Sequence, residues 1–340
     1  GGDVTLNNVT NNVAIVAADL TGASSLSYTD ADELSIGMIA QAGTGTAQLA
    51  AETGIVATGA DETVTVTSLT DQLTVDDVVT TASGNVVLMA TAGALQIDAA
   101  VTTTDGTATL TAGTTITSTA AGTITTTGVN AATQGTAGGE VLLHSTGAGA
   151  ITLSGDITAS GGNTTAGTND GGDAGVITVR NDSGSILIDD VTATGGTTAG
   201  GTAGTDGTIQ LSATTTIAQQ ATTAITAADG NLKLVSTGGD VTLNNVTNNV
   251  AIVAADLTGA SSLSYTDADG LSIGMIAQAG TGNAQLAAET GIVATGADET
   301  VTVTSLTGQL TVDDVITTTS GNVELMATAG ALLIDAAVTT

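Results

Sequence analysis

The chain has 340 residues, of which 33 are Asp or Glu and only 2 are Lys or Arg, so its formal net charge at pH 7 is −31. Because Lys and Arg supply most of a protein's affinity for phosphate backbones and anionic lipids, this composition excludes nucleic acid as a partner. Thr and Gly interrupt every aliphatic run before it reaches the length of about 18 residues that a membrane-spanning helix needs, which excludes membrane insertion.

The apolar residues of the chain are almost all aliphatic. Hydrophobic residues make up 41% of the sequence, but Phe, Trp, Cys and Pro are absent and Gly occurs 46 times. Ordinary globular domains fill their core gaps with large aromatic groups, whereas a narrow and uniform core can be filled by stacked aliphatic side chains. The composition therefore predicts a repetitive fold, and it excludes a disulfide framework.

The first residues, GGDVTL, include no Met and no basic or apolar leader, so we expect a processed product or an excerpt. Residues 1–103 recur 237 positions later as residues 238–340. The two copies differ at seven paired positions, which are Glu33/Gly270, Thr46/Asn283, Asp71/Gly308, Val79/Ile316, Ala82/Thr319, Val87/Glu324 and Gln96/Leu333. The repeat predicts one long unit, residues 1–237, followed by the start of a second unit, residues 238–340, in one continuous solenoid.

A shorter period of roughly 22 residues lies within the long unit and contains three alternating runs. The runs are short and rich in β-branched residues, as in 85–88, 94–98 and 101–103, or 177–179, 186–190 and 191–192. Runs of this type, bounded by Gly, Asn, Asp or Ser, are strands. We expect an all-β fold, a right-handed parallel β-solenoid with three strands per coil, in which 237 residues make roughly 11 coils over about 50 Å.

Alternation along the strands predicts which side chains fill the solenoid. Val86, Leu88, Leu95, Ile97 and Val101 should face inward. The exchange of Val87 for Glu at position 324 should then face solvent, because a slip of one residue would bury a charge.

Three consecutive coils carry Gly-rich insertions at one corner, after the third strand, at residues 128–139, 161–175 and 195–207. Stacked coils should place these loops side by side in one raised patch. The patch is a candidate ligand-binding surface. The alternative is that solvated loops are tolerated at this corner because they disturb no strand pairing.

Acidic residues at the corners are the candidate metal ligands. We expect stacking to bring together carboxylates of neighbouring coils, which would repel one another unless a cation such as calcium neutralised them. The candidate calcium ligands are Asp76, Asp77, Asp98, Asp156, Asp189 and Asp190. The alternative is that these outward Asp side chains cap turns and bind no metal.

The sequence contains two arrangements of residue types that occur in catalytic sites. The paired carboxylates 76–77, 189–190 and 313–314 could serve as acid and base in a glycosidase, but the chain lacks the aromatic platforms and cations that bind sugars. His144, the single histidine, follows an aliphatic strand with no nucleophile motif nearby and is expected to be solvated. We therefore expect no enzymatic activity and no required cofactor.

Segments such as GEVLLHSTG at residues 139–147 and ILIDDVTA at residues 186–193 resemble the repeats of bacterial filamentous-haemagglutinin-type adhesins and related giant β-strand-repeat surface proteins. The resemblance extends over essentially the whole chain. It implies a β-solenoid and a secreted protein of the cell surface or extracellular space.

Two classes of function follow from these features. The first is the structural shaft of a surface fibre, whose partner is the chain itself, by continuation or by head-to-tail stacking. The second is a binding module, either an adhesin that recognises a surface or carbohydrate through the three insertions, or an ice-binding solenoid with rows of Thr. The outward positions are too mixed for the flat Thr array of an ice-binding surface.

Overall fold

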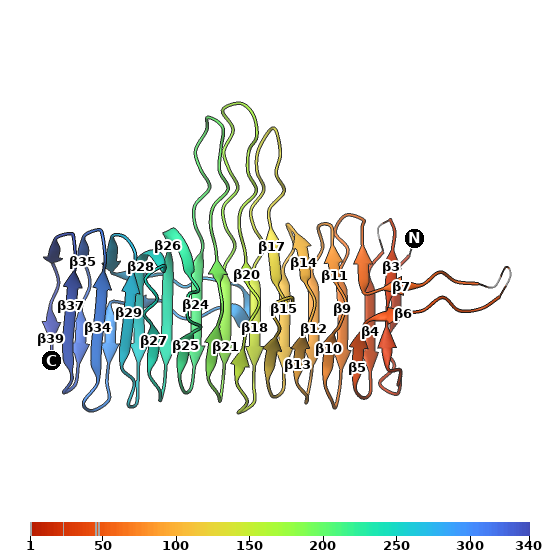
Figure 1. Cartoon of the computed structure of the whole chain (residues 1–340), viewed down its shortest axis with the longest axis horizontal. Coiled ribbons are helices and arrows are strands. Elements are labelled where there is room, and N and C mark those ends of the chain that lie inside the picture. Colours follow the sequence, from red (N-terminus) through yellow and green to blue (C-terminus); the bar gives the residue numbers. More distant parts are fainter. Residues whose placement is uncertain (1, 23, 45, 47) are drawn as a thin grey trace.

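The computed structural model describes residues 2–22, 24–44, 46 and 48–340. Short parallel strands stack along one axis to form a rod (Figure 1). The fold is an all-β parallel solenoid, as the alternating runs predict. A short 3-10 helix, η2, spans Gly282–Ala284, and no helix in the described part of the chain is long and apolar enough to cross a membrane.

Each coil contributes strands to three faces of the rod. The first face consists of β1 (Val4–Leu6), β4 (Leu26–Asp30), β9 (Val64–Ser68), β12 (Val86–Ala90), β15 (Ala108–Ala112), β18 (Val141–Ser145), β21 (Ile177–Asn181), β24 (Thr208–Ala213), the later parts of β26 (Ile225–Ser236) and β28 (Asn249–Leu257), β33 (Ile292–Ala294), β36 (Ile316–Thr318) and β39 (Val338–Thr339).

The second face follows the first along the chain. It consists of β2 (Ile15–Val16), β5 (Leu34–Ile36), β10 (Leu73–Val75), β13 (Leu95–Ile97), β16 (Ile116–Ser118), β19 (Ile151–Thr152), β22 (Ile186–Ile188), β25 (Ile217–Gln219), β27 (Val241–Leu243), β29 (Leu263–Asp267), β34 (Thr300–Ser305) and β37 (Asn322–Ala327).

The third face completes each coil. It consists of β3 (Ala18–Leu20), β8 (Ile55–Ala57), β11 (Val79–Thr81), β14 (Val101–Thr104), β17 (Ile124–Thr127), β20 (Ile157–Thr158), β23 (Val191–Thr192), the first residues of β26 and β28, β30 (Leu271–Ile273), β35 (Leu310–Val312) and β38 (Leu332–Ile334). β26 and β28 run through the corner between the third and first faces, so these two faces form one 23-stranded sheet.

The interior is a set of columns in which like residues stack from coil to coil. Leu73, Leu95 and Ile116, for example, occupy one register position on the second face and are fully buried. The predicted inward residues Val86, Leu88, Leu95, Ile97 and Val101 all have 0% exposure. Glu324 is exposed while its neighbours Val323 and Leu325 pack against the core, so the predicted register is confirmed.

The core is not purely aliphatic, which corrects the expectation from composition. Tyr28 and Tyr265 point inward, and each phenol donates a 2.7 Å hydrogen bond to a buried carboxylate two residues later, Asp30 or Asp267. The partner meets the requirement that a buried polar group be hydrogen-bonded.

The long unit contains fewer coils than its length suggests. Eight strand pairings, one per turn, separate β1 from β26 along the first face. β27, which has the same sequence as β1, follows β26 and lies on the second face. One unit of 237 residues therefore makes eight and a third turns, which rise by about 40 Å. The expectation of roughly 11 coils is wrong because it assumed a uniform turn of roughly 22 residues. Insertions lengthen several turns, so that 38 residues separate Leu26 from its partner Val64.

The extra third of a turn places the two sequence copies on different faces. Val4 pairs with Leu26 on the first face, whereas the equivalent Val241 pairs with Leu263 on the second face. Each copy keeps the same pairing partners within itself, so the rotation changes only the face that a given sequence occupies. The three faces accept the same strands because each requires only alternating inward aliphatic residues.

Candidate functional site

The three predicted insertions project together from one corner of the rod (Figure 1). They connect β17 to β18, β20 to β21 and β23 to β24, and each has an outgoing and a returning leg. We name residues 128–139, 161–175 and 195–207 the loop plate. Their placement side by side confirms what the stacking of coils predicts.

Backbone hydrogen bonds tie the legs of the loop plate into one layer. The Gly162 N–H donates to the Thr136 carbonyl at 2.8 Å, and the Gly172 N–H donates to the Gly162 carbonyl at 2.9 Å. The series continues from Gly196 to Gly172 at 2.8 Å and from Gly204 to Gly196 at 2.9 Å. Each bond joins the next leg in order, so the plate is an ordered assembly of backbone.

Glycine is required in the loop plate because the legs approach too closely for any side chain. A Cβ atom on Gly172 would lie 1.8 Å from the Thr136 carbonyl oxygen, and one on Gly204 would lie 1.8 Å from the Gly172 carbonyl oxygen. Glycines also recur every third residue at 201, 204 and 207. A Cβ atom on each would lie within 2.3 Å of a carbonyl oxygen of the neighbouring loop, so a glycine stands at each close approach.

Polar side chains close the exposed edges of the loop plate. Asn163 Oδ1 accepts hydrogen bonds from the backbone N–H of Thr197 at 2.7 Å and from its hydroxyl at 2.9 Å. Asp173 Oδ1 accepts the same pair from Thr205, both at 2.8 Å, and these bonds lower the pKa of the Asp173 carboxyl group. Several Asn and Asp side chains of the plate therefore bridge adjacent loops.

The structure brings together one set of the candidate metal ligands. Carboxylate oxygens of Asp156, Asp189 and Asp190 lie within 4.8 Å of one another, where two neighbouring coils meet. Burial raises the pKa of the Asp189 carboxyl group, and the charges of Asp190 and Asp156 raise it further. Asp190 Oδ1 also accepts a hydrogen bond from the Ala224 N–H, so this side chain has a structural partner.

The other predicted ligands, Asp76, Asp77 and Asp98, form no such group in the described residues. The Asp76 carboxylate accepts a hydrogen bond from the Ser35 hydroxyl on the preceding coil, and Asp98 accepts one from Gln96 at 2.6 Å. The N–H groups of Asp76 and Asp77 both donate to the Ile36 carbonyl. This arrangement recurs at residues 313–314, where both N–H groups donate to the Ile273 carbonyl. These carboxylates therefore lie at corners as turn residues.

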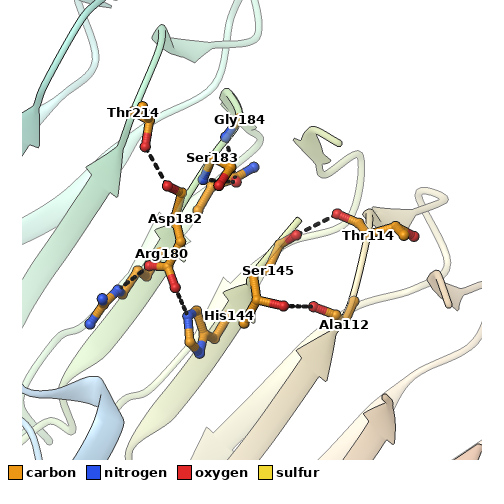
Figure 2. A network of polar contacts seen from close by, with 11 residues as sticks. Ala112, Thr114, His144, Ser145, Arg180, Asp182, Ser183, Gly184 and Thr214 are labelled. Carbon is orange, nitrogen blue, oxygen red and sulfur yellow. Dashed lines mark hydrogen bonds and ion pairs between the residues drawn. The ribbon is translucent and has the colours of Figure 1, made fainter. Parts of the chain in front are cut away.

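His144 is less solvated than its sequence context predicts. Its side chain is 12% exposed, and its Nε2 atom lies 2.9 Å from Asp182 Oδ2 (Figure 2). Arg180 donates to the other oxygen of Asp182 at 2.6 Å. Burial works to raise the pKa of Asp182, but the hydrogen bonds and charges of His144 and Arg180 outweigh it and lower the pKa.

Ser145 does not combine with His144 and Asp182 into a nucleophilic triad. Its hydroxyl is directed to the Thr114 carbonyl on a preceding coil (Figure 2). Successive residues of a strand point to opposite sides, so Ser145 faces the interior while His144 faces outward. The three residues thus serve local hydrogen bonding.

A second kind of insertion, a β-hairpin arm, occurs once in each copy and was not predicted from the sequence. The first arm spans residues 37–54 and contains β6 (Met38–Ile39) and β7 (Glu52–Thr53), and the second arm spans residues 274–291 and contains β31 (Met275–Ile276) and β32 (Glu289–Thr290). Both pairs are antiparallel. The short runs of the arms look like solenoid strands, so periodicity alone does not predict the arms.

The second arm folds back over the first face of the preceding coils. It covers outward side chains that would otherwise meet solvent, so Lys233, Gln210 and Thr178 are 0% exposed and Leu142 is 6% exposed. At its tip, the Thr281 N–H and hydroxyl donate to the Glu140 carboxylate, the hydroxyl at 2.8 Å. The arm thus spans several coils.

Lys233 is the main polar anchor of the second arm. Its ammonium group lies 3.0 Å from the Ala277 carbonyl oxygen, 2.7 Å from that of Ala287 and 3.5 Å from that of Leu286. Three carbonyls match the three protons of an ammonium group. Burial lowers the pKa of Lys233, while the nearby Glu289 carboxylate opposes that effect. A lysine at an outward position in a chain with 2 basic residues was the available sequence signal.

No protein-family model, curated protein or solved structure matches the chain.

Proposed function

We propose that the chain is part of the structural shaft of an extracellular surface fibre and that it has no enzymatic role. The observation that carries this proposal is the strand pairing across the boundary between the two sequence units. The boundary between the units follows Thr237. β26, in the first unit, pairs in parallel with β28, in the second unit. A unit that continues the ladder of the previous one lengthens a rod without any linker.

The chemistry of the surface supports an exposed location. The chain offers 2 basic residues and 2 aromatic residues, both Tyr and both buried, so proteases that recognise such side chains find few targets. The net charge of −31 keeps rods apart in solution. The loose resemblance to filamentous adhesins agrees with this assignment.

Two measurements test the shaft. Twelve strand pairings separate β1 from β39 along the first face, and at the spacing between neighbouring strands they give a length of about 60 Å. Electron microscopy of the purified chain should therefore show rigid rods of this length. Antibodies raised against the chain should label intact cells of the source organism. Labelling that requires permeabilised cells would reject the extracellular location, and compact particles would reject the rod.

The loop plate supports a second candidate function, adhesion. Its ordered backbone presents Thr, Asn and Asp side chains on a surface that projects beyond the rod (Figure 1). The suitable control is a variant in which residues 128–139, 161–175 and 195–207 are replaced by the short corner that joins β14 to β15. Binding of the natural chain, but not of the trimmed variant, to a glycan array would favour adhesion. Equal binding of the two would show that the loop plate is not the binding surface.

A further inference from the structure

The two arms have nearly the same sequence, and their described residues form the same strand pairs. Residues 37–54 and 274–291 differ only in the exchange of Thr46 for Asn283. An antiparallel bridge joins Ala42 to Leu49 in the first arm, and the equivalent bridge joins Ala279 to Leu286 in the second. Gly54 and Gly291 each have a φ of +68°, so the two arms rejoin the solenoid by the same backbone turn.

The arms differ in what lies beneath them. The second arm covers the first face, whereas the first arm projects past the N-terminal end of the rod (Figure 1). Ile276 is 3% exposed, but its equivalent Ile39 is 41% exposed. Leu49 is 75% exposed, while its equivalent Leu286 is partly buried. The apolar underside of the first arm is therefore uncovered.

A cavity of about 270 Å³ lies under the first arm. Its lining includes Ala40, Leu49, Ala50 and Glu52. The equivalents of these residues, namely Ala277, Leu286, Ala287 and Glu289, surround the ammonium group of Lys233 under the second arm. The same sequence thus forms an open cavity in one copy and a filled lysine site in the other.

The chemistry of the cavity selects a lysine side chain. Alanine, isoleucine and leucine side chains can pack against a methylene stem, and the carbonyl groups of residues 40, 49 and 50 can accept the three ammonium protons. Glu52 supplies the opposite charge. Arg fits less well, because its planar guanidinium group does not match a ring of carbonyls around a point charge.

We propose that the cavity under the first arm binds Lys233 of another copy of residues 104–237. The coils of that copy would precede residue 1 in the same way that residues 104–237 precede Gly238 in this chain. The arm would then act as a clamp that fixes the rotation and spacing of one unit on the previous one. Gln210 and Glu140 of that copy would hold the rest of the arm, as they hold Ala279 and Thr281 here. This proposal concerns how units join and does not depend on where the fibre is located.

The repeat itself supplies the test chain. Because residues 238–340 repeat residues 1–103, joining a second copy of residues 104–237 ahead of residue 1 recreates the natural junction after Thr237. Residues 238–340 contain no lysine, so stacking two unextended chains head to tail would not bring a lysine to the first arm. The full 340-residue chain is retained in the extended protein.

Hydrogen exchange read by mass spectrometry distinguishes the two arms, because Thr46 and Asn283 give their peptides different masses. In the unextended chain we expect the second arm to be protected and the first arm to exchange freely. In the extended chain the amides of the first arm should slow by roughly tenfold or more. Lys233→Met in the added coils should abolish that protection, whereas Arg180→Met in the same coils should leave it unchanged.

Cross-linking provides a second measurement that does not depend on exchange. The chain has no cysteine, so Thr281→Cys with Glu140→Cys in the unextended chain serves as the positive control for a short bismaleimide. Thr44→Cys with Glu140→Cys in the added coils should cross-link with similar yield. A first arm that stays unprotected and uncross-linked in the extended chain would overturn the proposal. Protection that survives Lys233→Met would overturn the role of the lysine.

Discussion

The Tyr265 hydroxyl group donates a 2.7 Å hydrogen bond to the Asp267 carboxylate in the interior of the solenoid. The same Asp267 oxygen accepts the Val250 N–H at 3.0 Å, and the other oxygen accepts the Asp269 N–H at 3.0 Å. Burial raises the pKa of both Tyr265 and Asp267. A buried carboxylate in a stacked aliphatic core thus depends on a small set of donors.

Tyr265→Phe should destabilise the rod by about 1–3 kcal/mol, because it removes a donor from a buried carboxylate. The urea midpoint and the local hydrogen exchange of β29 measure the change. Tyr28→Phe is the matched control, since Tyr28 makes the same 2.7 Å bond near the N-terminal end of the rod, where Tyr28 is 5% exposed. We expect a smaller effect there, and equal effects at both positions would contradict the role of burial.

The rod should become more stable as the pH falls from 7 toward about 4. Burial, with neighbouring carboxylates in some cases, raises the pKa of four carboxyl groups, which are Asp189, Asp256, Asp267 and Glu289. A group whose pKa is higher in the folded state than in the unfolded state binds more protons when the protein is folded. Its contribution to stability is therefore fully present below the pKa of the unfolded state and is lost as the pH rises through the pKa of the folded state.

Below about pH 4 the trend should reverse, because the pKa values of Asp173 and Asp182 are lowered and their contributions are lost on protonation. Thermal unfolding between pH 3 and pH 8 measures both limbs. A midpoint that rises steadily from pH 4 to pH 8 would show that the raised groups do not control stability.

Asp189→Asn should stabilise the rod at pH 7 by less than about 1 kcal/mol, because it removes one of three mutually repelling charges at a partly exposed site. Asp190→Asn is the matched control, since Asp190 also accepts the Ala224 N–H and should gain less. Calcium titration of the thermal midpoint tests the calcium prediction. A calcium-dependent rise that disappears in Asp189→Asn would identify these carboxylates as ligands.

The alternation of the strands made the architecture and the register predictable. Val86 and Leu88 are buried and Glu324 is exposed because inward and outward positions differ in polarity at every second residue. The insertions of the loop plate were predictable for a related reason, since each interrupts a regular period at the same corner.

The face that each copy occupies could not be predicted. All three faces impose the same alternating pattern, so the sequence of β1 and β27 does not reveal a rotation by a third of a turn. The contact of Lys233 with Ala287 was equally hidden, because it joins residues 54 positions apart through the path of an arm across several coils. Local patterns carry no information about such a path.

Gly172→Ala should disrupt the loop plate while leaving the solenoid intact. A Cβ atom would lie 1.8 Å from the Thr136 carbonyl oxygen, so the legs must separate and their mutual hydrogen bonds must lengthen. Hydrogen exchange should increase across residues 128–139, 161–175 and 195–207 without a shift in the thermal midpoint of the coils. Gly200→Ala is the milder control, because its Cβ would lie 3.0 Å from the nearest atom. Unchanged exchange in Gly172→Ala would show that the legs do not pack as tightly as the structure has them.

Lys233→Met should release the second arm from the first face. The methionine keeps the apolar stem but leaves the carbonyl groups of Ala277 and Ala287 without their buried donor. Hydrogen bonds to a charged group contribute about 2 kcal/mol, so the released state should become at least roughly thirtyfold more populated. Exchange of the β31 and β32 amides, and new protease cleavage within residues 274–291, report the release. Arg180→Met removes the other cation without touching the arm anchor and should leave the arm protected. If the arm is equally protected from exchange in the two variants, apolar packing of Ile276 and Leu142 holds the arm on the first face, and the hydrogen bonds of Lys233 do not.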